Sequence, residues 1–94
     1  MFRVALVALL ATLGAAAIAM AQPIGVPVCD ALLEKLEACA AKLPDDMQDD
    51  LRALNANERQ LLRPLSKRDA EVICKQNQAG YRRLNPWQDY GCRF

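Results

Sequence analysis

Apolar side chains recur every three or four residues in the stretch that begins at residue 29. They are Cys29, Leu32, Leu36, Cys39 and Leu43. This spacing places them on one face of an α-helix, while the charged residues between them fall on the other faces. The pattern predicts a first helix over residues 28–43, which Pro44 ends because proline cannot continue a helix.

Two further helices are predicted, and each is bounded by proline. Over residues 45–63, one methionine and four leucines keep a helical spacing, and Pro64 follows. Over residues 66–84, Ser66 is placed to cap the helix, and Asn85-Pro86 ends it. No segment alternates apolar and polar residues as a strand does. The predicted fold is therefore all-α, with about three short helices.

An export signal is predicted over residues 1–21. Arg3 precedes a long apolar run, and residues 19–21 read Ala-Met-Ala, the small-residue pattern after which signal peptidase cleaves. The mature chain would begin at Gln22 and work in the periplasm or outside the cell, with no membrane span left after cleavage. Residues 22–27 contain two prolines and a glycine and have no helical period. We therefore expect an extended, mobile leader before a single disulfide-bonded domain over residues 28–94.

Four cysteines remain after cleavage, and they are Cys29, Cys39, Cys74 and Cys92. An even number of cysteines in a short exported chain predicts two disulfides. A chain this short also gains little stability from its core alone. Cys29 and Cys39 lie about 15 Å apart along the predicted first helix. They cannot pair with each other, because a disulfide needs Cα atoms within about 7 Å.

Two pairings satisfy this condition. If the helices run up, down and up, Cys29 meets Cys74 and Cys39 meets Cys92. If Asn55 breaks the second helix, the third helix can run antiparallel to the first. That arrangement pairs Cys39 with Cys74 and Cys29 with Cys92. The short turns predicted between the helices favour the first arrangement.

The side chains that most enzymes use for catalysis are scarce. Residues 22–94 contain no histidine, no threonine and one serine. This composition excludes serine–histidine and cysteine–histidine catalysis, and the cysteine spacing disfavours zinc. We therefore expect a protein that is not an enzyme, with no cofactor. Four carboxylates near the start of the second helix are either a divalent-cation site or a solvated helix start that the helix dipole favours. They are Asp45, Asp46, Asp49 and Asp50.

Charge is divided unevenly along a chain that is balanced overall. Residues 22–58 carry eight acidic and three basic side chains, and residues 59–94 carry eight basic and three acidic ones. Because the totals are equal, overall charge gives no argument for nucleic acid or an anionic membrane. Either the two halves pack on each other, or the basic half keeps a patch for a partner.

The candidate patch combines arginine with aromatic side chains, the composition of binding hot spots. An alternative is that the small core needs these aromatic rings. The patch residues are Tyr81, Arg82, Arg83, Trp87, Tyr90 and Arg93.

The run CDALLEKLEACAAKLP over residues 29–44, with ICK at residues 73–75, resembles small exported, cysteine-paired helical proteins of Gram-negative bacteria. The resemblance implies a periplasmic, disulfide-bonded helical domain and brings no catalytic residue. We predict a non-enzymatic binding or interaction module, periplasmic or secreted, whose partner is an envelope protein or ligand. One alternative is a metal-dependent accessory factor or enzyme that uses the Asp45–Asp50 cluster. The other is a small secreted inhibitor or effector. The sequence leaves the oligomeric state open.

Export should shorten the chain. We expect the intact mass of the exported protein to match residues 22–94, either unmodified or with its N-terminal glutamine cyclised. Mass spectrometry of protein recovered from the periplasm or the medium checks this expectation. A full-length chain recovered from the membrane fraction would contradict it.

Overall fold

The computed structural model describes residues 22–94, so the signal predicted over residues 1–21 lies outside the described residues. The described part is all-α, as predicted. Its three helices are α2 (Pro27–Ala40), α3 (Asp45–Leu62) and α4 (Lys67–Arg83), followed by the short 3-10 helix η1 (Gln88–Tyr90). Each predicted helix is present, with ends that differ by at most three residues.

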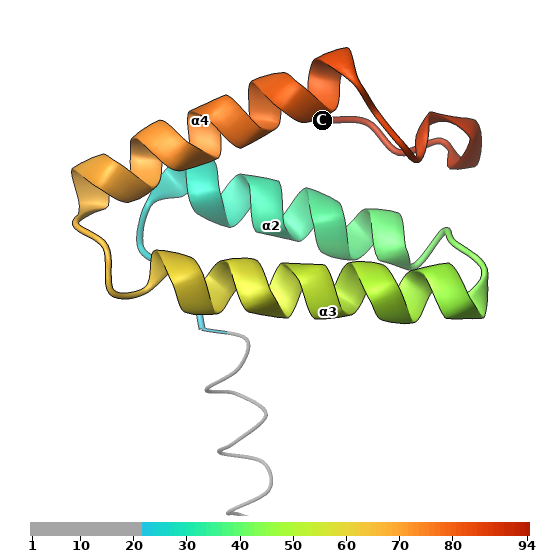
Figure 1. The fold of residues 1–94 in the computed structure, drawn as a ribbon, viewed down its shortest axis with the longest axis horizontal. Coiled ribbons are helices and arrows are strands. Elements are labelled where there is room, and N and C mark those ends of the chain that lie inside the picture. The colour runs from blue at the N-terminus through green and yellow to red at the C-terminus, as the bar shows by residue number, and fades with distance from the viewer. Residues whose placement is uncertain (1–21) are drawn as a thin grey trace, which may run out of the picture.

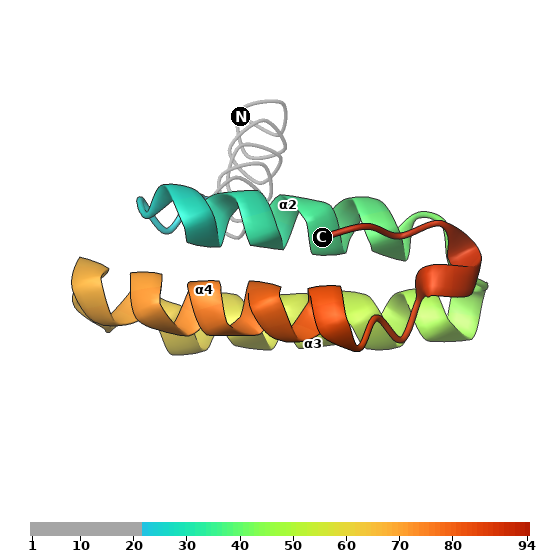
Figure 2. The ribbon, with the colours of Figure 1, turned by 90° about the horizontal axis from the view of Figure 1, so that it is seen from above.

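Helix α2 is the centre of the structure. It packs on both α3 and α4, whereas the backbones of α3 and α4 hardly approach each other. Figure 1 shows α2 between the other two helices, and Figure 2 shows that α3 and α4 lie on the same side of α2. The three helices therefore form a bundle that is open along the α3–α4 edge.

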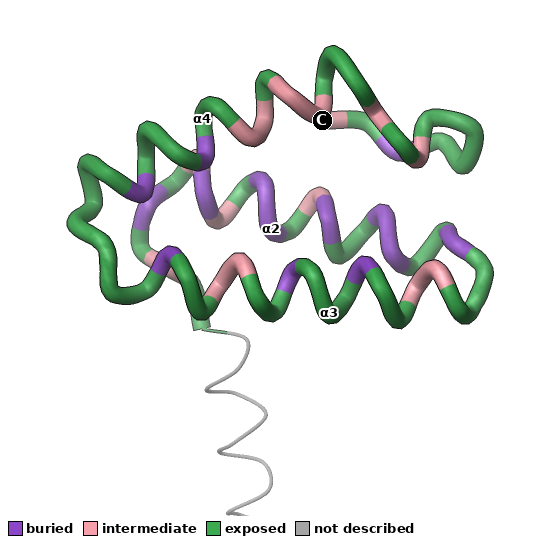
Figure 3. The backbone as a smooth tube through the Cα atoms, viewed as in Figure 1, coloured by how far each residue is buried: buried purple, intermediate pink, exposed green. Residues whose placement is uncertain are grey.

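The buried residues form two clusters along α2, which appears as the row of purple segments in Figure 3. The leader-side cluster consists of Val26, Cys29, Leu33, Leu62, Ala70 and Cys74. The tail-side cluster consists of Leu32, Leu36, Cys39, Ala40, Leu43, Leu51 and Cys92. Both clusters take residues from one face of α2, which is the face that the spacing of apolar residues predicts.

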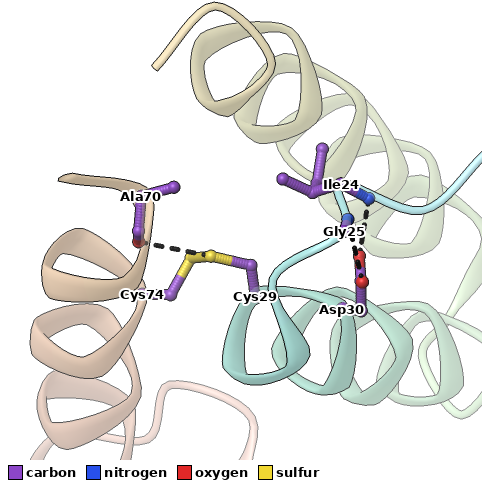
Figure 4. The surroundings of a disulfide bond; sticks show 6 residues. All are labelled: Ile24, Gly25, Cys29, Asp30, Ala70 and Cys74. Atoms are coloured by element: carbon purple, nitrogen blue, oxygen red, sulfur yellow. Dashed lines mark hydrogen bonds between the residues drawn. A yellow bond between two sulfur atoms is a disulfide. The ribbon is translucent and has the colours of Figure 1, made fainter. Parts of the chain in front are cut away.

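Each cluster contains one disulfide. Cys29 bonds Cys74 and Cys39 bonds Cys92, with a Cα–Cα distance of 5.2 Å in both pairs. This confirms the first of the two predicted pairings and the up-down-up order of the helices. The Cys29 sulfur also lies 3.2 Å from the carbonyl oxygen of Ala70 (Figure 4). Because a disulfide sulfur carries no hydrogen, this is a close sulfur–oxygen contact rather than a hydrogen bond.

Asn55 does not break α3, and its side chain links α3 to α2. It is buried, and its Nδ2 donates to the Leu33 carbonyl at 3.4 Å and to Glu37 Oε2 at 3.1 Å. The other carboxylate oxygen of Glu37 accepts from Arg52 Nε at 3.2 Å. A polar residue in the middle of a continuous helix therefore ties two helices together.

The leader is hydrogen-bonded to α2, a contact that we did not predict. Asp30 of α2 turns back to accept hydrogen bonds from the amides of Ile24 at 2.7 Å and Gly25 at 3.1 Å (Figure 4). Gly25 has a φ of 89°, a left-handed conformation that suits glycine. This turn directs Val26 into the leader-side cluster, where its side chain is buried. The prediction missed the contact because Ile24 and Val26 belong to no helical period.

Leu33 is fully buried in the leader-side cluster. Leu33→Ala should lower the free energy of unfolding by about 3 kcal/mol, because it removes buried methyl groups and leaves a cavity. Leu84→Ala is the matched control, since Leu84 is 83% exposed. We expect the control to change stability by less than about 0.5 kcal/mol. Urea unfolding followed by circular dichroism measures both, and equal losses in the two variants would show that the core is wrongly placed.

Candidate binding site at the tail

The Cys39–Cys92 disulfide returns the tail to α2 after α4 ends. Asn85 organises the turn, because its Oδ1 accepts from the Trp87 amide at 3.0 Å and its Nδ2 donates to the Cys92 carbonyl at 2.7 Å. Gly91 follows η1 with a φ of 81°, which lets the chain reverse toward Cys92. The tail is therefore held by side-chain bonds as well as by the disulfide.

Three aromatic rings of the tail region pack together. The ring of Tyr81 lies 5.7 Å from that of Trp87 and 5.0 Å from that of Phe94, measured between centroids. All three are half-buried against the tail-side cluster. Tyr90 is more exposed, and its hydroxyl donates to the Met47 sulfur at 3.5 Å. Tyr81 and Trp87 therefore serve mainly as packing, as the core interpretation of the candidate patch holds.

The arginines of the candidate patch lie outside this packing. Arg82, Arg83 and Arg93 are exposed. Arg82 Nε donates to the main-chain oxygen of Phe94 at 2.7 Å and so helps to hold the tail. Arg83 and Arg93 make no hydrogen bond or ion pair within residues 22–94. The structure therefore separates the predicted patch into a packed aromatic part and a basic, solvent-facing part.

Two clefts flank the returning tail. One, of about 410 Å³, has Arg82, Arg93 and Phe94 in its lining. The other, of about 300 Å³, is lined on the α2 side by Lys35 and Lys42 and on the tail side by Arg93. No sequence pattern adds these lysines to the patch. Lys35 lies on α2 and Lys42 in the turn that follows it, and only the path of the tail brings them beside Arg93.

The two oppositely charged halves do not neutralise each other by direct pairing. The ion pairs within residues 22–94 are Arg52–Glu37 and Lys75–Glu71, and each lies inside one half of the chain. Lys42 Nζ donates instead to the Gly91 carbonyl at 3.1 Å. The cations that line the clefts therefore have no side-chain carboxylate partner in the part of the chain that the structure describes.

Other candidate chemistry finds little support. Across residues 22–94, no three histidine, cysteine, aspartate or glutamate side chains are grouped to hold a metal ion. Asp45 and Asp46 occupy the first turn of α3, where the helix dipole favours negative charge. Ser66 caps α4 and accepts from the Asp69 amide at 3.1 Å, as predicted. All four cysteines are in disulfides.

These residues define a small all-α protein with two disulfides, a bonding state typical of an oxidising compartment outside the cytosol. None of the helices within residues 22–94 combines the length and the hydropathy that crossing a bilayer requires. Comparison with known protein families, with curated proteins and with solved structures finds no match to the chain.

Tyr81 provides a pH-dependent test of the aromatic packing. Burial raises the pKa of its phenol above the ordinary value of 10.0, and the Glu58 carboxylate adds to the rise. Above pH 10 the unfolded chain therefore loses this proton before the folded chain does. The stabilisation from Tyr81 is complete below pH 10 and is lost as the pH rises toward the folded-state pKa.

We expect the stability of the wild type to fall more steeply than that of Tyr81→Phe as the pH rises above about 10, because the variant keeps the ring and removes the titrating group. Urea unfolding across this range measures the difference, and effects of the lysines cancel between the two proteins. Identical pH dependence in both would contradict the packing of this phenol.

Proposed function

We propose that this chain is a non-enzymatic binding module that works in the periplasm or after secretion. Its binding site is the basic tail end, where the two clefts meet at Arg93. The partner is a protein that presents an acidic segment to Lys35, Lys42 and Arg93. This role accounts for a localised positive charge that internal ion pairs leave available.

The observation that carries the proposal is that no ion pair within residues 22–94 joins the acidic half of the chain to the basic half. A chain stabilised by its own charge pattern would place carboxylates of the acidic half against cations of the basic half. Of the two ion pairs found within residues 22–94, one instead joins two residues of the acidic half and the other joins two residues of the basic half. Exposed cations beside clefts of about 410 and 300 Å³ then attract an acidic partner and increase the rate of encounter.

Two further observations support a location in the periplasm or outside the cell. The export signal predicted over residues 1–21 directs the chain out of the cytosol. The two disulfides are stable in an oxidising environment. A rigid, disulfide-bonded tail also lowers the entropic cost of binding, because the cationic side chains project from a backbone that is already ordered.

Charge reversal at the tail tests the proposal. Arg83→Glu/Arg93→Glu changes two exposed side chains that bond to nothing within residues 22–94. Lys67→Glu/Arg68→Glu is the matched control, with the same change of charge at the other end of α4. We expect one envelope protein to be captured by the wild type and the control, and at least tenfold less of it by the tail variant. Capture should weaken as salt is added, because exposed charges are screened.

Two results would contradict this function. Equal capture by the tail variant and the control would show that the basic clefts are not the binding site. A saturable rise in melting temperature with millimolar calcium or magnesium, abolished in Asp46→Asn/Asp50→Asn, would support the metal-dependent alternative instead. Circular dichroism of each variant shows that its helices are intact before capture is compared.

A further inference from the structure

Several apolar side chains of α3, of α4 and of the loop between them are partly exposed. Leu54 and Ile73 are each 37% exposed and Leu61 is 58% exposed, although helices of this size usually turn such side chains inward. Leu65 in the loop between the helices is 37% exposed, and Leu84 at the end of α4 is exposed as well.

Helical spacing places the exposed apolar residues of α3 and α4 along the two edges of one groove. Glu58 of α3 and Asn77 of α4 both line the hollow whose floor is Leu33 and Leu36 of α2. Residues three or four apart on a helix are neighbours on its surface. Leu54 and Leu61 therefore flank Glu58 on the α3 edge. Ile73 and Gly80 likewise flank Asn77 on the α4 edge, and Leu84 continues that stripe. We call this surface the inter-helix groove.

The groove suits a helix better than a small molecule. The space between the three helices amounts to only about 10 Å³, close to the least that can hold a single water. A ligand cannot enter the core, so an occupant must lie across the two edges and cover them. Gly80 has no side chain, and nothing lies within 4 Å of where its Cβ would be, so the α4 edge is open at this position. An amphipathic helix places apolar side chains at this spacing into a groove between two helices.

The charges along the groove are acidic. Asp50 lies four residues before Leu54 on the α3 stripe, and Asp69 lies four residues before Ile73 on the α4 stripe. Glu58 stands between them in the lining of the hollow. The arginines of α3 and the arginine that follows it bond elsewhere: Arg52 to Glu37, and both Arg59 and Arg63 to the carbonyl of Gln22. An apolar groove with carboxylates at both ends and in its middle is complementary to a basic partner.

We propose that the inter-helix groove binds a cationic amphipathic helix of a partner protein. Leucine-like side chains of the partner cover Leu54, Leu61 and Ile73, and its lysines or arginines face Asp50, Glu58 and Asp69. A second copy of this chain is a poor occupant, because groove-to-groove docking would bring these acidic edges against each other. The groove is distinct from the basic tail site, and its occupant has the opposite charge.

The probe is an 18-residue synthetic helix with leucines on one face and lysines on the other, titrated into the mature, oxidised protein by calorimetry. The matched probe replaces every lysine with glutamate. We expect the lysine peptide to bind one to one and at least tenfold more tightly than the glutamate peptide. Leu61→Gln/Ile73→Gln should weaken binding at least tenfold. Val72→Gln, on the outer face of α4, should change it less than twofold. Asp50→Asn/Asp69→Asn should weaken binding and reduce its dependence on salt.

Several outcomes would overturn the proposal. These are no binding of the lysine peptide, equal binding of both peptides, or equal effects of the groove variant and Val72→Gln. Concentration-dependent dimerisation in sedimentation that Leu61→Gln/Ile73→Gln abolishes would identify a second copy as the occupant and would also overturn it. The tail variant Arg83→Glu/Arg93→Glu should keep peptide binding, so the groove and the tail site are tested separately.

Discussion

Helix α2 carries a disulfide near each end, and both sulfurs lie on the face that also holds its buried leucines. Cys29 ties α2 to α4 across 45 residues of sequence, and Cys39 ties it to the tail across 53. Loops of these lengths correspond to about 4 kcal/mol of stabilisation each in the chain-entropy model. The two loops overlap, so their effects do not simply add. Because α4 packs on α2 and hardly touches α3, the covalent bonds supply what a third helix–helix interface would otherwise provide.

The sequence determines the helices clearly and their connections less clearly. Spacing on the first helix identifies the face of α2 that is buried, and Ser66 marks the start of α4. The cysteine pairing depended on whether Asn55 interrupts α3, which no local pattern decides. The structure answers this through a contact between helices, the bond from Asn55 to the Leu33 carbonyl. The bonds of the leader were missed for a similar reason, because they depend on the carboxylate of Asp30 rather than on the composition of the leader.

The candidate site was predictable in part. Composition pointed to arginine and aromatic residues near the tail, but exposure depends on where Cys92 returns the chain. Once that bond is made, Tyr81 and Trp87 pack against the core, while Arg93 stays at the surface between two clefts. Lys35 and Lys42 join the site only through this return, since residues from opposite ends of the domain meet there. Patterns in a single sequence identify residues that are neighbours along one helix. This site instead consists of residues that the Cys39–Cys92 disulfide brings together from distant parts of the chain.

The two disulfides explain how a small chain can keep two exposed surfaces of opposite charge. A three-helix domain without covalent bonds would have to bury Leu54, Leu61 and Ile73 between α3 and α4 to hold the third helix in place. Here the Cys29–Cys74 bond fixes α4 on α2, so those side chains are released from the core and remain at an open edge. The Cys39–Cys92 bond similarly fixes the tail without requiring its cations to pair with the acidic half. Stability is thereby concentrated along α2, and the surfaces farthest from it are left available for partners.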